Sequence, residues 1–155
     1  MMMHLTSDVI KTLKGKTLAT AESCTGGGIG AALTAVAGSS EVFKGGVISY
    51  TNFVKETVLG VDKAVLEQYG AVSQPVALAM AKGVRNLLNT DIAVSVTGLA
   101  GPGGDDFGNP VGTVFIGYCD ATKCYVREYR FLGDREAVRN QATTTALKII
   151  LSENA

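Results

Sequence analysis

The run Ile92–Val96 most constrains how this chain can fold, because it is almost wholly apolar and no charged residue interrupts it. Such a run is typical of a strand at the centre of a sheet that is covered on both faces. Further strands are predicted at 17–20 and 47–50, and residues 113–119 and 124–131 indicate a hairpin. We therefore expect a sheet with helices on both sides.

Helical patterns fill the intervals between these strands. Apolar residues recur at helical spacing, glycines end several segments, and Ser, Thr, Asn or Asp residues stand where caps are expected. The predicted helices start at Thr6 or Ser7 and then span 27–36, 52–59, 62–70, 73–88 and 134–151, and Asp62 and Asp134 are the expected caps of the helices that they begin. This alternation predicts an α/β fold, a three-layer α/β/α sandwich on a mixed, mostly parallel sheet. Without repeats, linkers or low-complexity segments, residues 1–155 are expected to form a single domain.

Composition argues against several classes of function. The 14 basic and 14 acidic residues balance and no run of Lys or Arg occurs, so nucleic acid is not an expected partner. No apolar segment approaches the roughly 20 residues that cross a bilayer, so no membrane association is expected. Met1–Asp8 also lack the pattern of a secretory signal, and a cytoplasmic protein is the simplest interpretation.

The cysteines support the same interpretation. Cys24, Cys119 and Cys124 are odd in number and lack the spacing of a metal site. Cys119 and Cys124 flank the predicted hairpin turn and can face each other, but in a cytoplasmic protein we expect them to stay reduced.

His4 is the only histidine, and it lies in an N-terminal segment that we expect to be frayed. Acid–base chemistry must therefore use another group, and a zinc site would lack ligands. Asp105 and Asp106 are adjacent carboxylates without further ligands, which is weak evidence for a metal. We predict no metal and no cofactor.

The segment Ala21–Gly27 is the first candidate for chemistry, since it joins a predicted strand to the start of a predicted helix. Such a junction offers free backbone N–H groups to a phosphate or to the oxyanion of an acyl-transfer intermediate. Ser23 would lie beside these donors, and Cys24 is a second possible nucleophile that lacks a histidine base. On the local motif alone, helix caps at Ser23 and Thr25 and a tight glycine turn are the simpler interpretation.

Lys55 is the second candidate, because we expect it in the first turn of a short helix capped by Asn52. The helix dipole there is unfavourable for a cation, and with partial burial it would lower the pKa of the lysine. A neutral lysine can serve as the base of a serine nucleophile when no histidine is present. Tyr50 could orient this base. The plain alternatives are a solvated lysine and a tyrosine packed at the end of a strand.

A glycine-rich loop, Gly98–Gly112, is the third candidate. It follows the central strand at the edge where ligands gather in open α/β sheets, and such a length is uncommon unless a loop is functional or disordered. A mobile surface loop is the equal alternative. Ser39 and Ser40 could supply hydroxyls to the same pocket or only cap a turn. Arg135 could contact a phosphate or simply begin the last helix.

Several segments, in order along nearly the whole chain, together resemble the nicotinamide-nucleotide amidase family, which is the family of the C-terminal domain of CinA and its stand-alone form PncC. The segments that carry the resemblance are Ala21–Gly27, Ala37–Ser40, Tyr50–Asn52 with Lys55, Gly70–Ser73, Thr97–Gly104, Pro110–Val114, and Gly133–Arg135 with Val138–Arg139. The resemblance implies one α/β/α domain, stand-alone or excised from a longer chain. One departure is Asp105–Asp106, where the family often has a small or hydroxyl residue. Acidic side chains facing the pocket would repel a substrate phosphate.

The resemblance also implies an activity, the hydrolysis of nicotinamide mononucleotide to nicotinate mononucleotide and ammonia in pyridine nucleotide salvage, often in a homo-oligomer. It assigns Ser23 as nucleophile, Lys55 as base and Tyr50 as an active-site tyrosine. The substrate-binding residues expected with them are Thr25, Gly26, Gly27, Ser39, Asn52, Thr97, Gly98, Gly101, Gly103, Gly104 and Arg135. The rival hypotheses are a non-catalytic nucleotide-binding module of the same fold and an amidase for another substrate.

Overall fold

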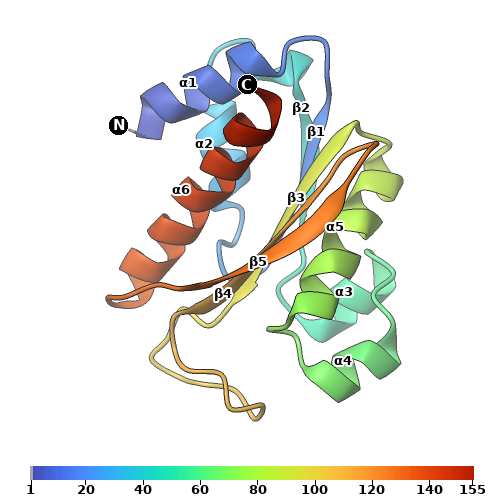
Figure 1. The fold of residues 1–155 in the computed structure, drawn as a ribbon, viewed down its shortest axis with the longest axis vertical. Coiled ribbons are helices and arrows are strands. Elements are labelled where there is room, and N and C mark those ends of the chain that lie inside the picture. The colour runs from blue at the N-terminus through green and yellow to red at the C-terminus, as the bar shows by residue number, and fades with distance from the viewer. Residues whose placement is uncertain (1) are drawn as a thin grey trace.

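A computed structural model describes residues 2–155, and Figure 1 shows a central sheet between two layers of helices. The strands are β1 (Leu18–Glu22), β2 (Phe43–Ile48), β3 (Ile92–Gly98), β4 (Thr113–Cys119) and β5 (Cys124–Arg130), in the order β2-β1-β3-β4-β5. β1 pairs in parallel with β2 and β3, whereas β4 pairs antiparallel with β3 and β5. Only β4 therefore runs against the others, and the predicted mixed, mostly parallel sheet is confirmed.

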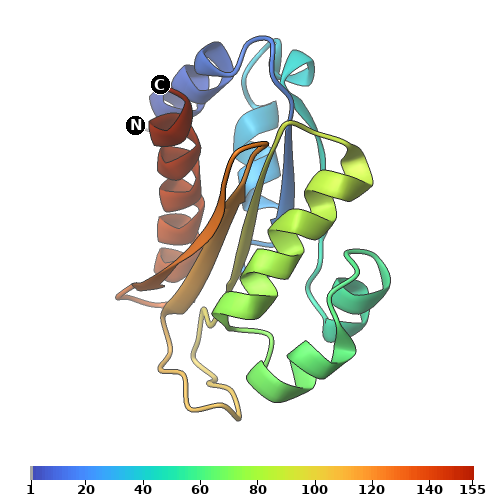
Figure 2. The same cartoon turned by 45° about the vertical axis from the view of Figure 1, so that its right-hand side comes forward.

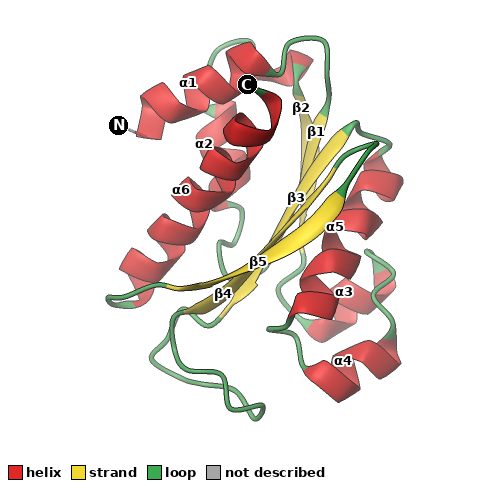
Figure 3. Ribbon diagram, viewed as in Figure 1, coloured by secondary structure: helices red, strands yellow, loops and turns green. Residues whose placement is uncertain are grey.

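Helices cover both faces of this sheet. One face carries α1 (Met2–Thr12), α2 (Gly28–Thr34) and α6 (Arg135–Asn154). The other carries α5 (Gln74–Leu88) with the short helices α3 (Asn52–Thr57) and α4 (Lys63–Tyr69). The rotated view in Figure 2 shows the two helical layers on opposite sides of the sheet. A 3-10 turn at Ser39–Glu41 leads into β2. In Figure 3 the long loop between β3 and β4 extends beyond one end of the sheet.

The central strand β3 is buried on both faces, as its apolar run predicts. Ile92, Val94 and Val96 belong to the hydrophobic core that includes residues of α1, α2 and α6. Ala93 belongs to the second core, beneath α5. Two separate cores thus hold the strand whose carboxyl end leads into the candidate site.

Two predicted boundaries are wrong. Helix α1 begins at Met2, so His4 lies within a helix, and Thr6 is buried with its hydroxyl donating to the carbonyl oxygen of Met2 instead of capping. Strand β2 begins at Phe43, four residues before the predicted start, and runs through a pair of glycines. Gly46 packs so closely against Thr20 of β1 that a Cβ would collide with it, so this glycine marks a close approach of two strands within β2 and not the start of the strand.

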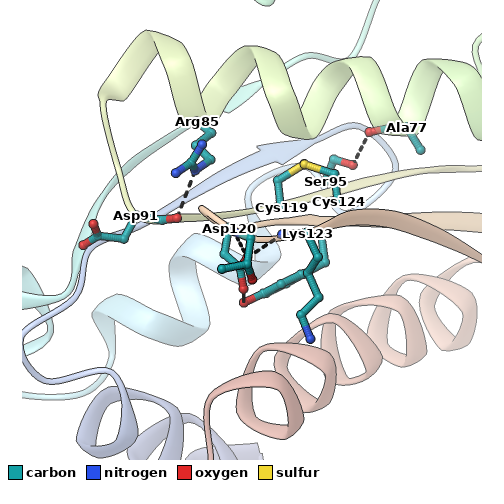
Figure 4. Close-up of a disulfide and its surroundings, with 10 residues drawn as sticks. Ala77, Arg85, Asp91, Ser95, Cys119, Asp120, Lys123 and Cys124 are labelled. Carbon is teal, nitrogen blue, oxygen red and sulfur yellow. Dashed lines mark hydrogen bonds between the residues drawn. A yellow bond between two sulfur atoms is a disulfide. The ribbon is translucent and has the colours of Figure 1, made fainter.

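The expectation that Cys119 and Cys124 stay reduced is also wrong, because they form a disulfide, shown in Figure 4. They face each other in the register of β4 and β5, with Cα atoms 4.1 Å apart. Asp120 tightens the turn between them, since its carboxylate accepts hydrogen bonds from the amides of Thr122 and Lys123. The hairpin geometry thus brings the two sulfur atoms together.

None of the helices formed by residues 2–155 combines the length and the apolar character needed to cross a membrane.

Candidate active site

The carboxyl ends of the parallel strands meet at one edge of the sheet and bring the first two candidate segments together. Ser23 directly follows β1, and its amide donates a 2.9 Å hydrogen bond to the carbonyl oxygen of Val96 in β3. Ser49 directly follows β2, and its amide donates a 2.8 Å hydrogen bond to the carbonyl oxygen of Glu22. These two bonds fix the exits of the strands relative to one another.

Lys55 reaches this junction from α3. The helix is capped by Thr51, not by the expected Asn52, and the Thr51 hydroxyl accepts a hydrogen bond from the amide of Val54. Lys55 Nζ lies 3.1 Å from Ser23 Oγ. It also donates to two backbone carbonyl oxygens, that of Ser49 at 2.7 Å and that of Tyr50 at 3.4 Å. The lysine thus contacts the serine from a position held by main-chain acceptors.

The environment of Lys55 favours its neutral form. Its side chain is 1% exposed, and burial lowers its pKa from 10.5 to about 8. The only salt bridge formed within residues 2–155 joins Lys123 and Glu153, so no carboxylate offsets the burial of Lys55. A buried lysine without an anionic partner, in contact with a serine hydroxyl, is an arrangement that can activate a nucleophile.

Cys24, the second possible nucleophile, has the opposite character. It is 6% exposed, and burial raises the pKa of its thiol to about 11. At neutral pH it is therefore a thiol, not a reactive thiolate, although it lies against the same cavity as Ser23.

A cavity of about 200 Å³ opens in front of Ser23 and Lys55. The predicted residues that line it are Tyr50, Thr97, Gly98, Gly101, Gly103 and Arg135. Four further residues line it that the sequence did not single out as binding groups, Ala71, Val72, Leu99 and Ala100. The apolar members suit the face of a planar ring, whereas the glycines expose backbone.

Arg135 bridges the mouth of this cavity from the start of α6, which Asp134 caps as predicted. Its guanidinium donates to the carbonyl oxygen of Gly101 at 2.7 Å and to the hydroxyl of Tyr50 at 3.2 Å. Tyr50 is 58% exposed, and its hydroxyl contacts this arginine and not Lys55. The tyrosine therefore belongs to the entrance of the site.

The other predicted binding residues do not line the cavity; they are Thr25, Gly26, Gly27, Ser39, Asn52 and Gly104. Thr25 is buried, and its hydroxyl donates to Glu22 at 2.8 Å. Asn52 lines a separate depression beside Phe107. Ser39 is buried in the 3-10 turn before β2.

The N-terminus of α2, predicted as an anion site, is already occupied. The amides of Ile29 and Gly30 donate to the carboxylate of Glu22 at 2.9 and 3.0 Å. Sequence reasoning missed Glu22, although a glutamate at the end of a buried strand and just before a helix start is itself an unusual signal.

Asp105 does not face the cavity either. Its carboxylate accepts hydrogen bonds from the amides of Phe107 and Asn109 and from the Asn109 side chain. Burial opposes ionisation of Asp105, but these hydrogen bonds outweigh it and lower its pKa. Asn109 in turn donates to the carbonyl oxygen of Val72 at 3.1 Å, so the acidic residue anchors the long loop instead of repelling a ligand.

Comparison with known families gives a match over nearly the whole chain. A family model described as the CinA C-terminal domain matches residues 2–153. A CinA-like protein from Geobacter sulfurreducens is 51% identical over 134 residues, covering 86% of this chain and 32% of that protein. Another from Rippkaea orientalis is 54% identical over 137 residues, covering 86% and 33%. The chain thus spans about a third of the length of these curated relatives.

Solved structures match over nearly their full length. A competence-damaged protein (CinA) superfamily protein from Klebsiella pneumoniae superposes with a TM-score of 0.96 at 35% identity, covering 99% of this chain and 97% of that one. A competence/damage inducible protein from Agrobacterium tumefaciens gives a TM-score of 0.95 at 38% identity, with coverage of 99% and 96%.

Proposed function

The chain belongs to the family of CinA C-terminal domains, and from that premise we propose that it is an amidohydrolase that deamidates nicotinamide mononucleotide. Ser23 is the nucleophile and Lys55 is its base. The observation that carries the proposal is the 3.1 Å contact between Ser23 Oγ and the Nζ of a lysine that is 1% exposed. The choice of substrate rests on the resemblance to nicotinamide-nucleotide amidases.

The acceptors around Lys55 suit a neutral base. A neutral amine has two N–H donors and one lone pair. The carbonyl oxygens of Ser49 and Tyr50 can take the two N–H groups, which leaves the lone pair for the hydroxyl proton of Ser23. In the protonated ammonium the third N–H points at Ser23 instead, and the serine is not activated. A base with a pKa of about 8 combines a useful neutral fraction at neutral pH with enough basicity.

The reaction then follows in two stages. Ser23 Oγ attacks the carboxamide carbon while its proton passes to Lys55, and the tetrahedral intermediate expels ammonia with a proton returned from Lys55. This leaves an ester between Ser23 and the nicotinate group. Lys55 next removes a proton from water, which attacks the ester carbonyl, and the same proton returns to Ser23 Oγ as nicotinate mononucleotide leaves.

The oxyanion requires backbone donors that are not already engaged. The amides of Gly26 and Gly28 donate to carbonyl oxygens within the turn. In contrast, the amides of Cys24, Ala100 and Gly101 make no hydrogen bond to another group of residues 2–155, and all three residues line the cavity. We assign the oxyanion site to these amides, and each donor of this kind is typically worth about 3 to 4 kcal/mol in the transition state.

Arg135 is the proposed contact for the substrate phosphate. It lies at the cavity mouth, and a bidentate guanidinium suits a phosphate. To bind it, Arg135 would exchange its hydrogen bonds to Gly101 and Tyr50 for the stronger ones to the anion. A cytoplasmic location, a homo-oligomeric state, and the treatment of residues 1–155 as one amidase domain complete the proposal.

The experiment measures ammonia release from nicotinamide mononucleotide by the wild type, Ser23→Ala and Lys55→Met. We expect release by the wild type and its loss in both variants. Two matched variants, Ser152→Ala and Lys148→Met, change exposed residues of the same types and should behave like the wild type.

Either of two results would contradict the proposal. Near-normal release by folded Ser23→Ala would remove the nucleophile. Absence of release from folded wild type, with nucleotide binding detected by calorimetry, would instead favour the non-catalytic binding module.

A further inference from the structure

Glu22 is a buried carboxylate that takes no part in the proposed bond-making, yet it lies directly before the nucleophile. It is 2% exposed. Its Oε1 accepts hydrogen bonds from the Thr25 hydroxyl at 2.8 Å and the Ile29 amide at 2.9 Å. Its Oε2 accepts from the Thr20 hydroxyl at 3.1 Å and the Gly30 amide at 3.0 Å. Both oxygens are thus fully used inside the protein.

This carboxylate acts as the cap that α2 otherwise lacks. The residue at the N-cap position is Gly27, which offers no side chain to the free amides of the first turn. Glu22 reaches these amides from the end of β1 instead, and a carboxylate near a helix N-terminus is electrostatically favourable. The strand and the helix are therefore joined through a side chain as well as through the chain between them.

We propose that Glu22 is a positioning residue for Ser23. Its bonds to Thr25 and to α2 close a ring around the short turn that carries the nucleophile, and so hold Ser23 Oγ within reach of Lys55. This inference rests on the proposed function, because positioning matters to turnover only if Ser23 attacks the substrate.

A second contact fixes the same turn from the side of α6. On the outer side of the turn, Arg139 of α6 donates to the carbonyl oxygens of Cys24 and Thr25 at 3.0 and 3.3 Å. The turn is thus held on its inner side by the carboxylate of Glu22 and on its outer side by the guanidinium of Arg139. These contacts restrict the movement of its peptide planes.

The decisive variants weaken the ring without removing Ser23 or Lys55. Glu22→Gln keeps the shape but replaces one acceptor oxygen with an NH2 group that cannot accept. Thr25→Val removes one hydroxyl at nearly constant volume, and Thr25→Ser restores it. Thr34→Val makes the same change at the exposed far end of α2 and is the matched control.

We expect a fall in kcat with little change in KM. Glu22→Gln should lower kcat by about 100-fold and Thr25→Val by about 10-fold, as expected when a reacting group is displaced by a fraction of an ångström to an ångström. Thr25→Ser should recover most of the loss, and Thr34→Val should keep the wild-type kcat. In an NMR spectrum, the amide proton resonances of Ile29 and Gly30 should move in Glu22→Gln. The Ile29 resonance should stay in place in Thr34→Val, because the hydroxyl lost there donates to the carbonyl oxygens of Gly30 and Ala31.

The outcomes separate this inference from the proposed function. An inactive wild type, or an active Ser23→Ala, overturns the proposed function and leaves the NMR comparison to report on Glu22. An active wild type with unchanged kcat in folded Glu22→Gln and Thr25→Val overturns the positioning role, as does a rise in KM alone. Should Glu22→Gln fail to fold, the Thr25→Val and Thr25→Ser pair decides by itself.

Discussion

The two ends of the sheet carry lysines in opposite settings. Where β1 ends, Lys55 is 1% exposed, contacts neutral acceptors and has its pKa lowered to about 8 by burial. At the other end, the side chain of Lys123 in the β4–β5 hairpin is 50% exposed and forms a 3.0 Å salt bridge with Glu153. Water and a carboxylate stabilise the charge of Lys123, whereas Lys55 has neither. The fold thus leaves Lys55 without either of the two influences that keep Lys123 charged.

Replacing each lysine in turn should give the largest difference in reaction rate. Lys55→Met should lower the rate of ammonia release by about 10⁴-fold or more, because the serine loses its base. Lys123→Met should stay within about twofold of the wild type, since an exposed ion pair contributes little. Initial rates at saturating substrate check both. A Lys123→Met variant as impaired as Lys55→Met would break the comparison.

The stability of the protein should report the cost of burying Lys55. Because its pKa is about 8 in the folded state and 10.5 without burial, the unfolded chain binds more protons between these values. The free energy of unfolding should therefore rise with pH from about 8 to 10.5, by at most about 3 kcal/mol relative to Lys55→Met. Urea titrations at several pH values measure this difference. A flat difference would mean that Lys55 is not desolvated.

The rate should follow the neutral fraction of Lys55. We expect kcat/KM to fall about tenfold for each pH unit below about pH 8 and to level off above it. The pH profile of kcat/KM for Lys123→Met should show the same fall below about pH 8. A profile without any rise between pH 6 and 8 would exclude Lys55 as the base.

The disulfide at the far end should matter for stability and not for catalysis. The double variant Cys119→Ala/Cys124→Ala should lose about 2 kcal/mol of unfolding free energy, as expected for a short closed loop. Its kcat should match that of the wild type. A substantial loss of kcat in this variant would show that the two ends of the sheet are coupled.

The smallest effect is expected at Ser49. Its hydroxyl is buried and has no hydrogen-bond partner among residues 2–155, while its carbonyl oxygen accepts from Lys55. Ser49→Ala should keep kcat within about twofold and raise stability by up to about 1 kcal/mol, since an unsatisfied hydroxyl is removed. Thermal unfolding and initial rates are the measurements. A large loss of activity would assign the hydroxyl a role of its own.

Much of the fold follows from local signals in the sequence. The apolar run Ile92–Val96 predicts the central strand, and Asp62 and Asp134 cap their helices as predicted. The start of β2 does not follow, because Gly45 and Gly46 favour a strand that begins only after them until the neighbouring strand that packs against Gly46 is known. A glycine in the sequence can indicate a turn or a close contact, and only the tertiary structure shows which neighbour lies against it.

Some residues of the candidate site could likewise be predicted from the sequence, and others could not. Ser23, Lys55 and Arg135 could be named from their motifs, and the structure brings all three to one cavity. Glu22 was missed, because a linear motif does not place the amides of α2 near its carboxylate and only its unusual position marks it. The disulfide was missed for another reason. Thiols are expected to stay reduced in a cytoplasmic protein, although Cys119 and Cys124 face each other in a hairpin that was itself predicted correctly.

The acceptors that hold Lys55 belong to the main chain, which has a consequence for how this site can change over evolution. Substitution of the side chains at Ser49 and Tyr50 leaves their carbonyl oxygens in place. The residues at the cavity mouth can therefore diversify while Lys55 stays where it is. Under the proposed function, the choice of amide and the cleavage of its bond become separable traits, and selection can act on one without disturbing the other.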